Sequence, residues 1–264
     1  MAAADRTRLR VTFDEDAERY DRARPAYPPA MFEHLADLAG IGPGCRVLEI
    51  GCGTGQVTVP LAERGCQIVA VELGANMASV AQRNLARFPL VEVVVAAFEQ
   101  WPLPSEPFDL VVAATAFHWL EPGVRMSRTA AALRPGGALA IISTDHVAGG
   151  DEGFFVEVQD CYERWDPATP PGLRPRPADQ IPTGSTELDR SGHFGPVALR
   201  RYEWELSYSM AAYLDLLRTY SGHIALAPDA RDGLLRCIAD LIDSRYGGHI
   251  TKRYLTRLHV AHRR

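Results

Sequence analysis

Five apolar runs alternate with amphipathic stretches between residues 46 and 143. The runs are near-continuous stretches of Val, Ile, Leu and Ala, as in parallel strands that are covered on both faces. They occupy residues 46–50, 67–72, 91–96, 110–114 and 138–143. Between them, apolar residues at helical spacing predict one helix through Met77, Val80, Ala81 and Leu85 and another through Met126, Ala130 and Leu133. This alternation predicts an α/β fold with a doubly wound, mostly parallel sheet.

The rhythm changes after residue 143. A helix is expected at 152–164, a long Pro- and Gly-rich loop at 166–196, and two further strands at 197–208 and 249–261, which bring the sheet to seven strands. Two helices, one through Met210 and one from Pro228, separate those last two strands. We therefore expect one domain over residues 1–264, divided into an N-terminal lid (12–30), a core (46–143), a Pro-rich insert (151–196) and a last part with strands and cap helices (197–264).

A glycine-rich turn directly follows the first predicted strand. It contains Gly51, Gly53 and Gly55, and an acid, Glu72, ends the second strand 21 residues after Gly51. Glycines allow a backbone to approach a ligand closely, and a carboxylate at the end of the second strand accepts hydrogen bonds from ribose hydroxyls. The pattern predicts a nucleoside-binding site at the carboxyl edge of the sheet.

Two details of the turn narrow the choice of ligand. A dinucleotide-binding turn has a third glycine where this chain has Gln56, and an acid, Glu49, stands two residues before Gly51. The segment from Val47 to Gly55 resembles motif I of the class I S-adenosylmethionine-dependent methyltransferases. The resemblance implies a Rossmann-like fold with S-adenosylmethionine as cofactor.

Other segments extend this resemblance over residues 12–144. Residues 108–112, 116–120 and 133–137 are similar to later motifs of the superfamily. Residues 19–28 are similar to the N-terminal segment of small-molecule methyltransferases of the trans-aconitate and ubiquinone type, where a Tyr and an Arg close over the cofactor. The cofactor-binding residues implied here are Tyr20, Arg24, Glu49, Gly51, Gly53, Gly55, Gln56, Glu72, Leu73, Met77, Ala97, Phe98, Glu99 and Thr115.

One position departs from the family pattern. Many relatives carry an Asp after the third strand that binds the adenine amino group, and here the matching residue is Ala97. The adenine is then expected to be held by packing on Leu73 and Phe98, by the Phe98 backbone N–H, or by Glu99. The loss of one hydrogen bond typically costs ~0.5–1.5 kcal/mol.

His118 is the candidate catalytic residue, because it follows the fourth strand at the ligand-binding edge of the sheet. A neutral imidazole is suited to act as a general base near pH 7. The alternative is a histidine that positions Trp119 or shapes the pocket, since methyl transfer needs a base only when the acceptor arrives protonated. The remaining candidates for substrate contact, each of which is also compatible with core or cap packing or with an exposed loop, are Tyr27, Trp119, His146, Trp165, Tyr220 and His223.

Composition restricts the remaining function classes. The 264 residues carry a net charge of −5, which disfavours a nucleic-acid partner. A basic cluster at the end (Lys252, Arg253, Arg257, Arg263, Arg264) is better explained as a solvated last strand and tail than as an RNA site. Five scattered cysteines without metal-ligand spacing favour free thiols, no bound metal and a cytoplasmic protein. No signal peptide or membrane-spanning run is expected.

These observations predict S-adenosylmethionine-dependent methyl transfer to a small organic molecule, on O, N or C. A first alternative is a cofactor-binding scaffold or cofactor-assisted cyclase without methyl transfer. A second is a nicotinamide-dependent oxidoreductase, which Gln56 disfavours, and a third is an RNA methyltransferase, which the acidic balance disfavours. Neither the substrate nor the oligomeric state is predicted from this sequence.

Overall fold

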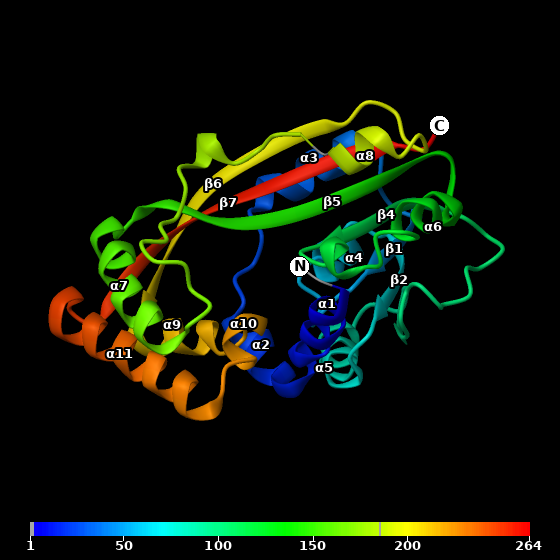
Figure 1. The fold of residues 1–264 in the computed structure, drawn as a ribbon. Helices are drawn as coiled ribbons and strands as arrows, with labels where there is room; N and C mark the ends of the chain where they lie inside the picture. Colours follow the sequence, from blue (N-terminus) through cyan, green and yellow to red (C-terminus); the bar gives the residue numbers. More distant parts are fainter. Residues whose placement is uncertain (1–2, 185) are drawn as a thin grey trace. The chain divides into compact units, whose positions relative to one another are not determined.

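The computed structural model describes residues 3–184 and 186–264, and Met1, Ala2 and Ser185 lie outside the described residues. A seven-stranded sheet has the order β3-β2-β1-β4-β5-β7-β6 (Figure 1). Its strands are β1 (Arg46–Ile50), β2 (Gln67–Glu72), β3 (Val91–Val95), β4 (Phe108–Ala114), β5 (Leu133–Gly150), β6 (Ala198–Ser209) and β7 (His249–His262). The predicted α/β, Rossmann-like fold is confirmed.

The first five strands of the order, β3 to β5, pair in parallel. The direction reverses between β5 and β7. The Arg263 N–H donates to Gly137 O at 2.8 Å, and the Asp151 N–H donates to Thr251 O at 2.9 Å. Residue numbers thus rise along one strand as they fall along the other, so these two strands run antiparallel and the sheet is mixed.

The described residues divide into two compact units. Unit 1 comprises residues 3–25, 145–182 and 203–255, and unit 2 comprises residues 26–144, 183–184, 186–202 and 256–264. The three internal boundaries that follow residues 144, 202 and 255 fall within β5, β6 and β7.

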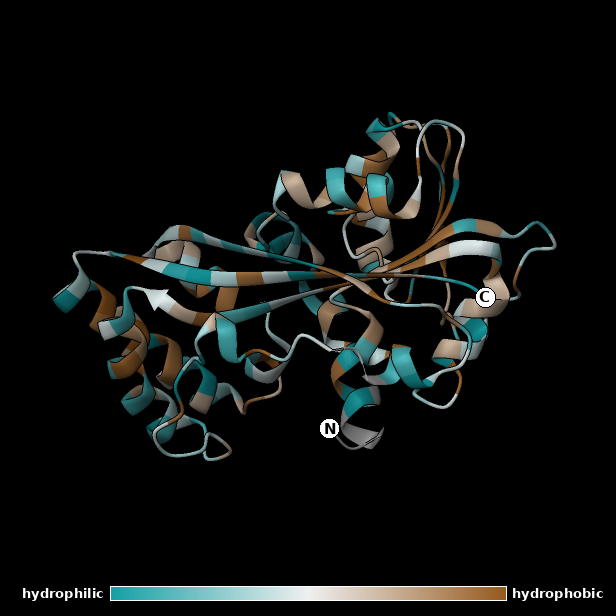
Figure 2. Ribbon diagram, turned by 90° about the horizontal axis from the view of Figure 1, so that it is seen from above, coloured by the Kyte–Doolittle hydropathy of each residue, from teal (hydrophilic) through white to brown (hydrophobic). Residues whose placement is uncertain are grey.

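Unit 2 contains the parallel strands and the helices that connect them. Its helices are α3 (Pro29–Ala39), α4 (Thr58–Glu63), α5 (Ala75–Leu85), η2 (Phe117–Trp119), α6 (Arg125–Ala132) and α8 (Thr186–Arg190). Alternate residues of β1 enter different clusters: Val47 packs with α3, α4 and α5, whereas Leu48 packs with α6. Both faces of the parallel sheet are therefore buried, which explains the continuous apolar runs of the sequence. The hydrophobic colour of these strands is visible in Figure 2.

Unit 1 is mainly helical and has its own core. Its helices are α1 (Ala3–Arg10), η1 (Thr12–Asp16), α2 (Ala17–Ala23), α7 (Glu152–Trp165), η3 (Ala178–Gln180), α9 (Met210–Leu217), α10 (Ser221–Ile224) and α11 (Pro228–Tyr246). Aromatic and aliphatic side chains of α7, α9 and α11 pack with residues of β6 and β7, including the fully buried Phe154, Leu234 and Ile242.

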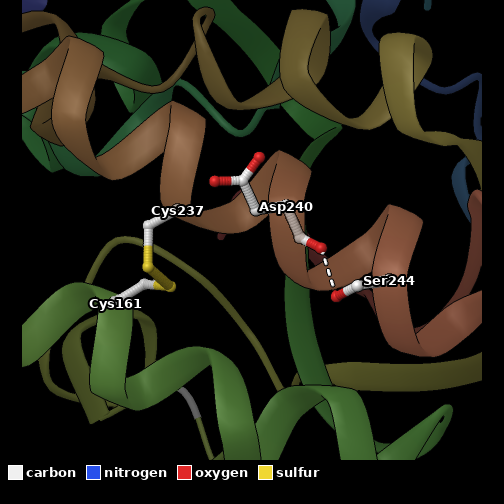
Figure 3. The surroundings of a disulfide bond; sticks show 4 residues. All are labelled: Cys161, Cys237, Asp240 and Ser244. Carbon is white, nitrogen blue, oxygen red and sulfur yellow. Dashed lines mark hydrogen bonds between the residues drawn. A yellow bond between two sulfur atoms is a disulfide. The ribbon is translucent and has the colours of Figure 1, made fainter.

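A disulfide joins α7 to α11 within unit 1. Cys161 and Cys237 are bonded to each other, and their Cα atoms lie 5.8 Å apart (Figure 3). The prediction that all five cysteines are free thiols is therefore wrong for this pair. Cys45, Cys52 and Cys66 are free. The two half-cystines are 76 residues apart in the chain, and no local spacing in the sequence indicates that they meet.

The predicted and observed elements differ most clearly in three places, and β5 also continues to Gly150, beyond the predicted end at residue 143. Strand β5 begins at Leu133, directly after α6, so the Arg134–Gly137 segment belongs to the strand and does not precede it. The expected loop at 166–196 contains η3 and α8. Three helices, not two, separate β6 from β7, because α10 is a single short turn that the sequence pattern does not reveal. Among the described residues, no helix combines the length and hydropathy that a membrane span requires.

Candidate functional site

The glycine turn after β1 has a backbone shape that favours glycine. Gly51, Gly53 and Gly55 have φ values of 68°, 59° and 103°, a region that residues with a Cβ atom rarely adopt. A Cβ atom built on Gly51 would lie 2.7 Å from the Ala116 Cβ atom, so the turn also packs closely on the segment after β4. The turn thus presents bare backbone at the carboxyl edge of the parallel strands, where ligands bind in this class of sheet.

Glu72 and the glycine turn are joined directly. The Gly53 N–H donates to one Glu72 carboxylate oxygen at 2.9 Å, and the Gly74 N–H donates to the other at 3.0 Å. These two bonds fix the carboxylate at the end of β2. A carboxylate has roughly four acceptor positions, so the same group can accept hydrogen bonds from the hydroxyls of a ribose. The residues present therefore fit the nucleoside part of S-adenosylmethionine.

Glu49 lies beneath the turn and is almost fully buried, with 2% of its surface exposed. The Thr58 hydroxyl donates to its carboxyl group at 2.7 Å. Burial is the main reason that the pKa of Glu49 is raised to about 8, and the nearby Glu72 charge adds to the effect while the Thr58 hydrogen bond opposes it. The side chain is therefore mostly protonated at pH 7, and a cation bound beside it would favour its ionised form.

The segment after β3 supplies apolar surface near the ends of β2 and β3. Phe98 is buried, and its carbonyl accepts a hydrogen bond from Arg128 Nε at 2.8 Å. Met77 of α5 is also buried, whereas Leu73 and Ala97 are half-buried. A Glu99 carboxylate oxygen accepts a hydrogen bond from the Glu121 N–H at 3.2 Å. Apolar side chains thus outnumber charged ones in the segment predicted to hold the adenine.

The segment after β4 carries the one described non-glycine residue with a positive φ. Thr115 has φ 53°, and its N–H donates to Ile142 O at 2.8 Å. The Tyr27 and Thr115 hydroxyls lie 3.0 Å apart, within hydrogen-bond distance. Such a conformation is strained for threonine, and strained residues cluster at functional sites. The structure thus brings together Tyr27 and Thr115, two residues that the sequence assigns to substrate and cofactor contact.

His118 lies in η2, three residues beyond Thr115. Its ring centroid is 4.8 Å from that of Trp119, and part of its side chain remains exposed. The surrounding protein atoms are the main cause of a lowered pKa for His118, and the Arg125 guanidinium lowers it further. The imidazole is therefore neutral near pH 7, as a general base must be before it accepts a proton.

Unit 1 brings together four other residues from the sequence predictions. The Arg24 guanidinium lies 4.8 Å from the Tyr20 ring centroid and 4.8 Å from that of Tyr220. The Tyr220 and His223 ring centroids are 5.7 Å apart. Tyr20 and Arg24 were assigned to the cofactor and Tyr220 and His223 to the substrate, and within unit 1 these residues form one group.

His146 and Trp165 lie in the same unit but in different surroundings. The His146 ring packs edge-on against Phe155, and its Nε2 atom is buried without a hydrogen-bond partner in the described chain. Burial and the Lys252 charge lower the pKa of His146 to about 2. Trp165 packs so closely on α11 that a Cβ atom built on Gly233 would lie 2.4 Å from its ring. Trp165 is thus part of the contact between α7 and α11.

Lys252 is a residue whose environment the sequence did not predict. It was assigned to a solvated last strand, but only 3% of its surface is exposed. The assignment is wrong because Lys252 has the same strand periodicity as the buried Ile250 and Tyr254 of β7. That period of two, which places the three side chains on one face, is the signal that was available in the sequence.

No group of three or more His, Cys, Asp or Glu side chains is arranged to hold a metal ion in residues 3–184 and 186–264. The candidate chemistry of unit 2 therefore rests on the glycine turn, two acids and the segment after β4.

Comparison with known proteins identifies the relatives of this chain. A family described as "Methyltransferase domain" matches residues 48–141. An uncharacterised methyltransferase of Geobacillus kaustophilus is 31% identical over 161 residues, which are 58% of this chain and 73% of that protein. An uncharacterised methyltransferase of Mycobacterium tuberculosis is 34% identical over 134 residues, 51% of this chain and 52% of that protein. The chain thus spans about half the length of this mycobacterial relative.

A relative with a named activity is the malonyl-[acyl-carrier protein] O-methyltransferase of Geobacter sulfurreducens, which is 37% identical over 44% of this chain and 45% of that protein. Among solved structures, a protein from Anaeromyxobacter dehalogenans assigned as a type II methyltransferase is 25% identical, covers 90% of this chain and 97% of its own, and has a TM-score of 0.64. With the glycine turn and Glu72 in place, these likenesses show that the chain belongs to the class I S-adenosylmethionine-dependent methyltransferases.

Proposed function

We propose that this chain binds S-adenosylmethionine in unit 2 and transfers its methyl group to a small organic molecule. The hydrogen bond between the Gly53 N–H and the Glu72 carboxylate is the observation that carries the proposal. It joins the bare backbone of the turn to the acid that recognises ribose, and the family membership supports the choice of cofactor. The named O-methyltransferase among the relatives supports transfer over cofactor binding alone.

Each predicted residue has a role in this proposal. Gly51, Gly53 and Gly55 leave space for the methionyl part, with Gln56 at the end of the turn. Residues of the segments after β2 and β3 form the adenine wall, namely Leu73, Met77, Ala97, Phe98 and Glu99. Thr115, Tyr27 and Trp119 line the acceptor side in unit 2. Tyr20 and Arg24, expected at the cofactor, and His146, Trp165, Tyr220 and His223, expected at the acceptor, all lie in unit 1, where Arg24 packs on Tyr220 and Trp165 packs on α11.

Methyl transfer requires little from the protein beyond orientation of the acceptor and exclusion of water from the site. When bound, S-adenosylmethionine supplies a methyl group on a positively charged sulfur that is already a good leaving group. The chain's own residues must orient the acceptor and exclude water, and orientation alone supplies a large share of a rate increase. His118 removes a proton from an acceptor that arrives protonated; its lowered pKa keeps the imidazole available for that step.

Substitution of Glu72 tests the cofactor site. Glu72→Ala removes the carboxylate that would bind the ribose, and charge-assisted hydrogen bonds are worth about 1.5–3 kcal/mol. We therefore expect at least about ten-fold weaker S-adenosylmethionine binding by calorimetry. Glu63→Ala in α4 is the matched control, because Glu63 is an exposed acid paired with Arg87. Unchanged affinity in a folded Glu72 variant would contradict the proposed site.

A panel of small acceptors tests the transfer itself. Release of S-adenosylhomocysteine that depends on an added acceptor supports methyl transfer. Tight cofactor binding without such release, across acids, phenols, amines and enols, would instead support the scaffold or cyclase alternative.

A further inference from the structure

Lys252 is the only lysine among the 264 residues, which contain 28 Lys and Arg residues in total. It is also buried, with 3% of its surface exposed. Its ammonium group donates a hydrogen bond to the Tyr220 hydroxyl at 3.0 Å. It also lies 5.9, 5.2 and 5.1 Å from the ring centroids of Tyr213, Tyr220 and Tyr254. A cation–π environment of this kind stabilises a charged ammonium away from water.

No carboxylate of the described residues forms an ion pair with Lys252. Buried cations in proteins are normally paired, since transfer of an isolated charge out of water is costly. The three rings and one phenol oxygen supply partial negative charge only. The ammonium therefore lies in a site that can still accept a full negative charge.

A second cation faces the same tyrosine. Arg24 Nε donates to the Thr219 hydroxyl at 2.9 Å, and Arg24 Nη2 donates to the Thr219 carbonyl at 2.8 Å. Both acceptors are neutral, and the guanidinium lies 4.8 Å from the Tyr220 ring centroid. We call Arg24, Tyr213, Tyr220, Lys252 and Tyr254 the tyrosine–lysine cluster.

The direction in which the pKa of Tyr220 is shifted indicates that the electrostatic potential in this cluster is positive. Burial by itself would raise the pKa of the Tyr220 phenol, but the charges of Lys252 and Arg24 outweigh burial and lower the pKa below its ordinary value of 10. The field at the phenol oxygen therefore favours a negative charge. Tyr220 and Arg24 are only partly buried, so the cluster is in contact with solvent at part of its surface.

The neighbouring histidines indicate how much positive charge the cluster holds. Burial and Lys252 lower the pKa of His223 to about 4, against an opposing effect of Asp166, and His146 is lowered further. Both rings are neutral near pH 7, which leaves Lys252 and Arg24 as the cations. Arg24 already donates two hydrogen bonds to Thr219, so Lys252 is the cation that lies directly at the Tyr220 oxygen. One such charge suits a carboxylate monoanion, and the aromatic walls suit an apolar body.

We propose that the tyrosine–lysine cluster of unit 1 binds the carboxylate of an organic acid with an apolar body. The carboxylate site is formed within unit 1 and does not depend on cofactor binding in unit 2.

Calorimetric titration of the full chain tests the carboxylate site. The probes are acetate, hexanoate, benzoate and phenylacetate, each with and without S-adenosylhomocysteine, and benzamide and phenyl phosphate serve as the neutral and the phosphate comparison. We expect the apolar acids to bind more tightly than acetate, benzamide and phenyl phosphate. Absence of binding by all four acids, or tighter binding of phenyl phosphate than of benzoate, would overturn the proposal.

Three variants locate the binding. Lys252→Met should weaken binding of the apolar acids at least about ten-fold, because a charge-assisted bond is lost. Arg24→Gln tests the second cation and keeps the inference testable if Lys252→Met does not fold. Arg253→Met is the matched control, since Arg253 is the next residue of β7 and pairs with Glu205. If Lys252→Met and Arg24→Gln bind the apolar acids as tightly as the native chain does, the acids bind outside the cluster and the inference is overturned.

Cofactor binding by the same proteins separates the two proposals. Lys252→Met should lose acid binding and keep S-adenosylmethionine binding. If the native chain binds the acids through Lys252 but does not bind S-adenosylmethionine, the proposed function fails and the carboxylate site stands.

Discussion

The candidate sites of the two units carry charges of opposite sign. In unit 2, Glu49 and Glu72 lie beside a turn of bare backbone, where the Gly53 N–H donates to Glu72 and the Thr58 hydroxyl donates to Glu49. In unit 1, Lys252 and Arg24 lie around Tyr220 without a carboxylate partner in the described chain. Acids suit a cationic ligand with hydroxyl groups, and cations suit an anionic one. We therefore propose that the positively charged cofactor and a negatively charged organic acid are recognised by different units.

The two sites also differ in what builds them. Backbone N–H groups and positive φ angles shape the unit 2 site, so its form depends on a few glycines close together in sequence. The unit 1 site is formed by side chains from the residue after α2, from α9 and the segment after it, and from β7. Ligand binding in unit 2 should therefore be sensitive to one added Cβ atom, and ligand binding in unit 1 to the removal of one charge.

The largest effect is expected from Gly53→Val. Gly53 has φ 59°, so valine would strain the turn and place a branched side chain where the ligand must approach. We expect S-adenosylmethionine affinity to fall at least ~100-fold by calorimetry, with binding of the apolar acids unchanged. Gly44→Val is the control, because Gly44 has φ 83° but precedes β1 and has open space around it. Normal cofactor affinity in Gly53→Val would remove the basis for the unit 2 site.

Substitution of His118 tests whether a residue of unit 2 also accepts a proton during the reaction. If His118 is a general base, His118→Ala should lower kcat by ~10²–10⁴-fold. His118→Asn should be equally slow, because an amide does not accept a proton at neutral pH.

The pH profile gives an independent reading of His118. Since the pKa of His118 is lowered from 6.5, the native rate should rise with pH below 6.5 and be flat above it, as the imidazole loses its proton. Near-native kcat in the Asn variant with a raised KM would assign His118 to shaping the pocket.

Reduction of the disulfide should weaken unit 1 selectively. Cys161 and Cys237 close a loop across 76 residues, and loop-closure entropy alone corresponds to about 4 kcal/mol. We expect hydrogen exchange to accelerate in α7 and α11 after reduction, or in Cys161→Ala/Cys237→Ala, while β1 and β4 stay protected. Cys45→Ala is the control, since Cys45 is a free thiol in unit 2. Equal acceleration in both units would show that they do not respond separately.

The smallest effect is expected from Glu49→Gln. The folded pKa of about 8 lies above the ordinary value of 4.5, so the folded protein keeps a proton that the unfolded chain releases. The contribution of Glu49 to stability is therefore present below pH 4.5 and is lost as the pH rises through 8.

Glutamine keeps the acceptor for Thr58 and does not ionise. We therefore expect Glu49→Gln to raise the melting temperature above that of the native chain, and to raise it by about 5 °C more at pH 8 than at pH 5. A gain that does not depend on pH would mean that Glu49 is not protonated in the folded state.

Much of unit 2 could be predicted from the sequence, because its signals are local. Continuous apolar runs indicate strands buried on both faces, and the glycines and Glu72 lie within 22 residues of one another. The contact between Gly51 and Ala116 was not predicted, since it depends on how β1 and β4 pair.

Unit 1 was harder to predict because its contacts join distant segments. Arg24 meets Thr219 across 195 residues, and Cys161 meets Cys237 across 76. Residue type alone also misled: a lysine followed by arginine in the last strand suggests solvent, and only the alternation with Ile250 and Tyr254 places Lys252 inside.

The use of a single, buried lysine has a consequence for covalent chemistry. Acylating enzymes, aldehydes and amine-directed cross-linkers react with unprotonated, accessible amines, and within these 264 residues the one ε-amine is 3% exposed. Every other strongly basic side chain is a guanidinium, which stays charged and inert to such reagents. The side chains of this protein therefore offer almost nothing to the acetylation and coupling reactions that modify most protein surfaces, and any amine adduct found on one of them reports that the tyrosine–lysine cluster has opened.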